Sequence, residues 1–174
     1  QSHRHQHHSL SFLPGAGLGE AAAILVGRYL GARRPDLAHD STASARLLAL
    51  ITMGACAVIF VLLGEHIAAV FTSDPEVQRL TAELLLYAAI FQLCDAIAIV
   101  NLSALRAAGD TRFTLLATTG TGWLILVPIS VYLGWFEGMG VSGAWIGMVL
   151  ELFVLAMLTS WRMRGLASGK VGRI

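Results

Sequence analysis

The chain has 174 residues, of which 56% are hydrophobic and only 13% are charged, and its mean hydropathy is +0.69. Soluble domains carry about 25% charged residues, so this composition excludes an ordinary soluble domain and favours an integral membrane protein. The formal net charge of +1 gives no indication of nucleic-acid binding, and we expect no nucleic-acid partner. Cys56 and Cys94 lie in apolar runs, which predicts small buried side chains and no disulfide.

Residues 1–8, QSHRHQHH, hold four of the six histidines and include no initiator methionine. We expect a disordered leader that is a truncated, processed or artificially appended end. A metal site formed by these histidines is the alternative, but flexible histidine tracts bind metals without a function. We therefore exclude the leader from the fold and expect no metal cofactor.

The first transmembrane helix is expected over residues 9–32. Small residues recur in it at every fourth position, forming a stripe of Gly15, Gly19, Ala23, Gly27 and Gly31. Such a stripe lets the backbone of a second helix approach closely. Glu20 lies halfway along this helix, next to the stripe.

The second and third helices are expected over residues 36–71 and 76–108. Pro35 ends the first helix and leaves Asp36 to cap the second. The third helix follows either Ser73 or Asp74 as its cap, and Pro75 suits its first position. Residues 80–105 are apolar and numerous enough to cross a bilayer at about 1.5 Å per residue.

Asp95 lies near the middle of the third helix, and no Lys or Arg lies within ten residues of it. An isolated carboxylate at bilayer depth is costly and is rarely present for packing alone. Asp95 is therefore the strongest candidate for a functional residue in this helix.

The fourth and fifth helices are expected over residues 112–133 and 141–163, followed by a flexible basic tail over residues 166–174. Pro128 should kink the fourth helix, which also carries a cluster of threonines. Glu151 lies halfway along the fifth helix. The sequence thus predicts an all-α integral membrane protein, with about five transmembrane helices forming one lobe over residues 9–165.

The basic residues indicate the orientation of these helices. Of the eleven Lys and Arg outside the leader, ten are assigned to one side of the membrane, and only Arg79 is assigned to the other. The positive-inside rule makes the ten-residue side cytoplasmic. We therefore expect a multi-pass protein of the inner (plasma) membrane with a cytoplasmic C-terminus. Five spans with an external N-terminus suggest a piece of a larger protein.

Three acids lie near mid-membrane by counting: Glu20, Asp95 and Glu151. Placing a charged Asp at the centre of a helix costs about 3 kcal/mol, and protonating an Asp at pH 7 costs about 4 kcal/mol. Because these costs are similar, a change in water access or a nearby cation would switch the protonation state. That property suits a proton- or sodium-coupled carrier. Glu151 could equally pair with a Thr or Trp of a neighbouring helix.

Tyr87, Phe91 and Asp95 are spaced by four and share a helix face, and Gln92 lies within one turn of Asp95. Aromatic rings beside a carboxylate suit an organic cation, although Tyr87 and Phe91 could also be ordinary packing residues.

Arg106, Asp110 and Arg112 form a charged turn after the third helix, either as a salt-bridged loop or as a gate. Asn101 and Ser103 are expected to form hydrogen bonds between helices.

Several segments resemble the multidrug and toxic compound extrusion (MATE) transporters. GAGLGEAAAILVGRYLGARRPDLA is similar to the first cytoplasm-directed helix of a MATE lobe. Phe91, Gln92 and Asp95, followed by LRAAGDTR, resemble that family's FQxxD and LRGxGDTR segment, and GVSGAWIG resembles its last helix. The resemblance covers residues 10–165 and corresponds to helices eight to twelve of a twelve-helix transporter. Ala107 and Ala108 depart from it, because they replace the usual glycine.

The resemblance implies the carboxy-terminal lobe of a secondary antiporter that exports cationic amphipathic compounds in exchange for H+ or Na+. Its partners would be small organic cations, the lipid bilayer and the amino-terminal lobe of the same transporter, which this sequence lacks. The alternatives are a lipid-linked saccharide flippase of the same superfamily and a non-transporting membrane scaffold subunit. Because no phosphate-binding loop, paired-cysteine motif or catalytic triad is present, we expect no enzyme and no cofactor besides the coupling ion.

Overall fold

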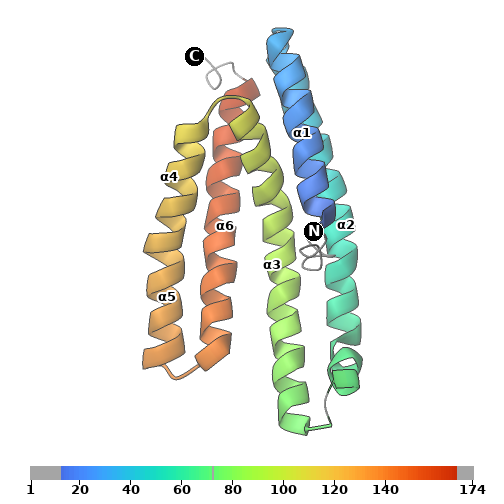
Figure 1. Cartoon of the computed structure of the whole chain (residues 1–174), viewed down its shortest axis with the longest axis vertical. Helices are drawn as coiled ribbons and strands as arrows, with labels where there is room; N and C mark the ends of the chain where they lie inside the picture. The colour runs from blue at the N-terminus through green and yellow to red at the C-terminus, as the bar shows by residue number, and fades with distance from the viewer. Residues whose placement is uncertain (1–12, 72, 168–174) are drawn as a thin grey trace, which may run out of the picture.

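The computed structural model describes residues 13–71 and 73–167, and within them every regular element is a helix (Figure 1). The leader and residues 168–174 of the expected tail lie outside the described residues. The helices are α1 (Leu13–Gly31), α2 (Pro35–Phe71), α3 (Pro75–Ala107), α4 (Thr111–Thr121), the π-helix η1 (Gly122–Leu126), α5 (Val127–Val131), the π-helix η2 (Tyr132–Phe136) and α6 (Gly140–Ala167). The predicted all-α class is confirmed.

The helix α3 is the centre of the arrangement. It packs against α1 and α2 on one side and against α6 on the other, and α6 in turn packs against the continuous rod from α4 to η2 (Figure 1). Successive rods alternate in direction, so the ends of α1, α3 and α6 lie at the same end of the molecule as the starts of α2 and α4 (Figure 1). Because the chain is rich in arginine at these positions, we name this the basic end.

The small-residue stripe of α1 packs only along its first half. A Cβ added to Gly15 would lie 2.8 Å from the Met53 sulfur, and one added to Gly19 would lie 3.0 Å from Oγ of Ser103. A Cβ on Gly27 or Gly31 would meet nothing within 4 Å. Within the described residues the close approach predicted for the stripe is therefore found at Gly15 and Gly19 and not at Gly27 or Gly31, because a period of four residues drifts by about 40° per step around a helix of 3.6 residues per turn.

The glycines that pack most tightly lie instead at the start of α6. A Cβ on Gly143 would lie 2.6 Å from the backbone nitrogen of Gly134, and one on Gly147 would overlap the hydroxyl of Ser130. These two positions are one helical turn apart, so they let α6 and the α5–η2 rod approach at backbone distance.

The expected break at Pro128 takes the form of a π-helical turn. Proline has no N–H, and its ring clashes with the carbonyl four residues earlier. The chain widens just before it, where the N–H of Val127 bonds to the carbonyl of Gly122, five residues back. The rod then continues through η2 to Phe136, beyond the predicted end of the fourth helix.

Of the predicted N-terminal caps, the one on α3 is observed and the one on α2 is not. Asp74 caps α3 as predicted, and its Oδ1 accepts a 2.9 Å hydrogen bond from the backbone N–H of Glu76. Asp36 does not cap α2, because Pro35 is already the first residue of that helix. The Asp36 carboxylate instead pairs with Arg34, with Nη2 and Oδ2 2.9 Å apart.

Four of the described helical rods are long and apolar enough to cross a membrane: residues 35–63, 75–107, 111–136 and 140–165. The number differs from the expected five because α1 does not qualify; it has 19 described residues, which include Glu20, Arg28 and several glycines. The expected start of the first helix at residues 9–12 lies outside the described residues. Large apolar side chains such as Leu116, Leu124 and Trp135 are more than 70% exposed, as lipid-facing residues are.

Candidate functional site

Asp95 is buried on α3 without a hydrogen-bond partner for one of its oxygens. Its side chain is 8% exposed, and Oδ2 has no partner within the described part of the chain. Oε1 of Gln92, one turn earlier on the same helix, is also buried without a partner. Buried polar atoms are normally hydrogen-bonded, so two orphaned oxygens on adjacent turns mark a place prepared for another group.

Glu151 on α6 is the second acid of this region. Its Oε1 lies 2.7 Å from Oγ1 of Thr121, so the expected pairing with a threonine of a neighbouring helix is present. Glu151 and Asp95 lie close enough to influence each other electrostatically across the α3–α6 interface. Since no ion pair of either acid is found in residues 13–71 and 73–167, two carboxylates share a region without a compensating cation.

The hydroxyl of Thr121 can serve both protonation states of Glu151. It lies 2.7 Å from the Glu151 carboxylate and 3.4 Å from the carbonyl of Thr118. An ionised carboxylate only accepts hydrogen bonds, so the hydroxyl then donates to Glu151. When Glu151 is protonated it can donate instead, and the hydroxyl proton can turn to the Thr118 carbonyl. The geometry therefore satisfies Glu151 in both states.

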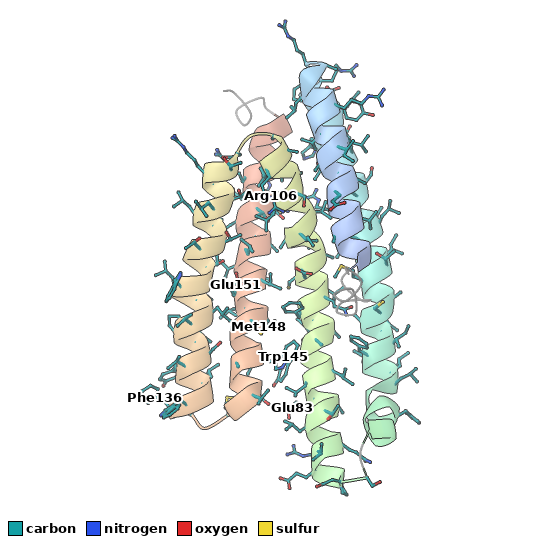
Figure 2. All side chains as sticks on the ribbon, viewed as in Figure 1. Glu83, Arg106, Phe136, Trp145, Met148 and Glu151 are labelled. Atoms are coloured by element: carbon teal, nitrogen blue, oxygen red, sulfur yellow. The ribbon has the colours of Figure 1, made fainter. Side chains whose placement is uncertain are left out.

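The two aromatic residues of the predicted face, Phe91 and Tyr87, contact different partners. Phe91 meets the Trp145 ring of α6 edge-on, with centroids 6.0 Å apart. The hydroxyl of Tyr87 donates to Oε1 of Glu83 at 3.2 Å, one turn toward the start of α3 and away from Asp95. Figure 2 shows Trp145, Met148 and Glu151 in succession along α6, with Glu83 near the lower end of α3. Phe91 therefore forms an aromatic contact across the α3–α6 interface with Trp145, a partner that the helical spacing on α3 did not indicate.

Glu20 lies apart from this group. It is exposed on α1, and it forms no hydrogen bond or ion pair within the described residues. Its neighbour Gly19 packs on α3 beside Ser103. The structure therefore brings together Asp95, Gln92, Glu151 and Phe91 and leaves Glu20 and Tyr87 outside.

The charged turn after α3 forms an ion pair with α6 and none between its own residues that the described part of the chain shows. Nε of Arg162 lies 2.6 Å from Oδ2 of Asp110, and the Arg162 guanidinium lies 5.3 Å from the centre of the Phe113 ring. Arg106 donates only to Oγ of Ser103, at 3.3 Å. Asp110 is therefore paired with an arginine of α6 and not with its neighbours in the turn.

A polar network between α2, α3 and α6 lies toward the basic end. Asn101 is fully buried, and its amide donates to Oγ1 of Thr159 at 3.3 Å and to Oγ of Ser160 at 3.1 Å. Its carbonyl oxygen accepts from Arg46 at 3.4 Å. The interhelical role expected for Asn101 is confirmed, whereas its contact with Arg46 could not be predicted from local sequence because the two residues are 55 positions apart.

No group of three or more His, Cys, Asp or Glu arranged to hold a metal is found among the described residues, and Cys56 and Cys94 are free and partly buried. The oxygens of Asp95, Gln92 and Glu151 are hard donors, which suit a proton or an alkali cation better than a transition metal.

Comparison with known proteins decides the family. A family model described as MatE matches residues 6–133, about three quarters of the chain. The chain belongs to the MatE family. The resemblance drawn from its motifs is thereby confirmed.

Curated relatives of this MatE chain carry multidrug resistance names. It is 38% identical over 159 residues to a probable multidrug resistance protein NorM of Mannheimia succiniciproducens, covering 89% of this chain and 34% of that protein. It is 34% identical over 167 residues to a probable NorM of Bacillus subtilis, covering 94% of this chain and 33% of the relative. It is 37% identical over 166 residues to the multidrug resistance protein MdtK of Yersinia enterocolitica, covering 91% of this chain and 35% of the relative.

The fold has a solved counterpart. An inward-facing multidrug resistance MATE family transporter of the MOP superfamily superposes with a TM-score of 0.72 at 21% identity, over 87% of this chain and 34% of that one. The MatE chain therefore spans about a third of the length of the proteins it matches.

Proposed function

We propose that this MatE chain forms the carboxy-terminal lobe of a secondary antiporter of the inner membrane, which exports cationic amphipathic compounds in exchange for H+ or Na+. The names of the relatives support multidrug export as the activity of the complete protein. The observation that carries the proposal is Asp95, a buried carboxylate with an orphaned oxygen and no ion pair within the described residues, on the helix that packs against α6 and its acid Glu151.

The two acids would couple ion movement to transport. When both Asp95 and Glu151 are ionised, their like charges repel each other in a poorly hydrated environment, and a proton or Na+ held between them relieves the repulsion. The orphaned oxygens of Asp95 and Gln92 would be natural ligands for that cation. Thr121 would hold Glu151 in place in either protonation state.

The substrate would compete with the coupling ion for the same charge. A cationic, apolar compound can place its charge near Asp95 and its ring system near the Phe91–Trp145 pair. Substrate and ion would then be mutually exclusive, which is what an exchanger requires. Tyr87 and Glu20, which lie outside the acid group, remain predictions as substrate or ion residues, and so does the gate role of Arg106, Asp110 and Arg112.

Alternating access would come from rocking of this lobe against a second lobe in the longer protein. The basic end would face the cytoplasm, together with the C-terminus, by the positive-inside rule. The other readings are a lipid-linked saccharide flippase, which would need cations in its cavity, and a non-transporting scaffold. The unpaired acids favour the antiporter over both.

The complete protein in proteoliposomes tests the proposal. An imposed inward H+ or Na+ gradient should drive efflux of an organic cation dye, and dissipating the gradient should stop it. The 174-residue chain reconstituted alone should show no gradient-driven efflux, because a rocking carrier needs two halves. Complete protein that moves no dye under either gradient would favour the scaffold reading.

A further inference from the structure

A groove at the basic end carries charge that the acid group does not use. It has a volume of about 400 Å³ and lies between the end of α3 and the start of α4. Arg106, Arg112 and Thr111 line its polar part, and Leu102 and Leu115 line its apolar part. Figure 2 places Arg106 near the end of α3 that adjoins α4.

The two arginines of the groove are not neutralised. Asp110, the acid nearest to both arginines in the sequence, is held by Arg162 of α6 at 2.6 Å. Arg106 contacts only the neutral hydroxyl of Ser103, and neither Arg106 nor Arg112 has an ion pair within residues 13–71 and 73–167. The groove therefore has two guanidinium groups available for an anion.

The start of α4 adds to this attraction. Asp110 precedes the helix but forms no side-chain capping hydrogen bond, because its carboxylate is turned to Arg162. The first backbone N–H groups of a helix have no partner inside it and favour a negative group. The groove reaches Thr111, the first residue of α4, so these amides and both arginines act on the same space.

The apolar part of the groove indicates which kind of anion would bind in it. Leu115 is 65% exposed, and Leu116, which follows it in the sequence, is 72% exposed. The groove thus opens onto a surface suited to acyl chains while its rim presents two arginines. A free phosphate would use only the rim, whereas a phospholipid would use both parts.

We propose that this groove binds the phosphate of an anionic phospholipid from the leaflet at the basic end. Each guanidinium group can donate two parallel hydrogen bonds to phosphate oxygens. The acyl chains would pack along Leu102 and Leu115 toward the bilayer interior. The bound lipid anchors the α3–α4 turn, which is the connection between the half of the lobe that holds Asp95 and the rod that holds Thr121.

The test uses the complete protein in detergent, with the first bound phosphatidylglycerol or phosphatidylcholine counted by native mass spectrometry. Wild-type protein should bind phosphatidylglycerol about 25-fold more tightly than phosphatidylcholine, from roughly fivefold for each arginine. Arg106→Gln/Arg112→Gln should lose most of this preference. Arg33→Gln/Arg164→Gln removes the same charge from exposed positions at the same end, outside the groove, and should keep the preference.

Thermal unfolding in phosphatidylcholine alone provides the folding control, and both double variants should match the wild type there because all four arginines are exposed. An unchanged preference in Arg106→Gln/Arg112→Gln overturns the proposal. Equal losses in the two double variants also overturn it, since general surface charge then explains the binding. Stabilisation by inorganic phosphate equal to that by phosphatidylglycerol would assign the groove to a free anion and overturn the lipid.

Discussion

Oγ1 of Thr121 lies 2.7 Å from Oε1 of Glu151, so the last residue of α4 is joined to the middle of α6 within the span. Thr121 is 4% exposed, which shields this hydrogen bond from water. The contact gives the second acid of the site a fixed position relative to Asp95 on α3. It also explains how an acid with no basic partner is tolerated at that depth.

Thr121→Val should weaken this arrangement, because valine has nearly the same shape but no hydroxyl. We expect the free energy of unfolding of the complete protein to fall by about 1 kcal/mol. Thr121→Ser keeps the hydroxyl and serves as the matched control, with a smaller loss. Denaturant unfolding in detergent compares the two variants, and equal stability of Val and Ser variants would mean that the hydrogen bond contributes nothing.

The Asp110–Arg162 pair should show measurable coupling. The Asp110 side chain is 13% exposed and that of Arg162 is 35% exposed, so solvent screens the pair only partly. A double-mutant cycle with Asp110→Asn and Arg162→Gln should give a coupling energy of about 1 kcal/mol in unfolding. The Arg34–Asp36 pair, with both side chains more than half exposed, is the control and should give a smaller coupling energy because solvent screens it more fully. Equal coupling in the two pairs would contradict this difference.

Gly143→Ala should destabilise the lobe, because the new Cβ would lie 2.6 Å from the backbone nitrogen of Gly134, and backbone cannot move aside like a side chain. The expected loss is about 1–3 kcal/mol in unfolding free energy. Gly27→Ala places a Cβ where nothing lies within 4 Å and should be neutral or slightly stabilising. Thermal unfolding of the two variants side by side checks this, and the opposite order would mean that η2 and α6 lie farther apart than in the structure.

The helices themselves could be predicted from the sequence because apolar length and cap residues are local signals. Asp74 and Pro75 mark the start of α3, and Asp95 stands out as an acid in a long apolar run. The packing of the glycine stripe could not be read in the same way. Gly15 and Gly27 look equivalent in sequence, and only the rotation of the stripe around α1 separates them.

The pairs of residues that contact each other within the site also could not be predicted without the three-dimensional fold. Glu151 and Thr121 are 30 positions apart, and Arg162 and Asp110 are 52 apart, so no local pattern joins them. Tyr87 shares the helical spacing of Asp95, yet its hydroxyl turns toward Glu83, because a nearby carboxylate acceptor decides the orientation of a hydroxyl more strongly than spacing does.

The orientation of the lobe can be checked with single cysteines at its two ends. Ala32→Cys lies between α1 and α2 at the basic end, and Ser73→Cys lies between α2 and α3 at the other end. In intact cells an impermeant thiol reagent should label Ser73→Cys and spare Ala32→Cys, since the basic end is expected in the cytoplasm. Wild-type protein serves as the control, because it reports any labelling of the native Cys56 and Cys94. Labelling of Ala32→Cys with protection of Ser73→Cys would invert the proposed topology.

Substitution of Asp95 addresses the centre of the account. Asp95→Asn keeps the size and hydrogen-bonding reach of the side chain but removes its titratable charge. Expression and membrane insertion should be unchanged or better, because the cost of about 3 kcal/mol for a charged Asp at a helix centre disappears. Asp95→Glu keeps the charge on a longer arm and should retain part of the activity with an altered pH profile.

The most direct measurement is dye efflux by complete Asp95→Asn protein in proteoliposomes, under an imposed H+ or Na+ gradient and at the same protein density as the wild type. We expect gradient-driven efflux to fall to the level of empty liposomes in Asp95→Asn, while Asp95→Glu transports at an intermediate rate. Normal efflux with normal ion dependence in Asp95→Asn would contradict it and would make Asp95 a structural residue.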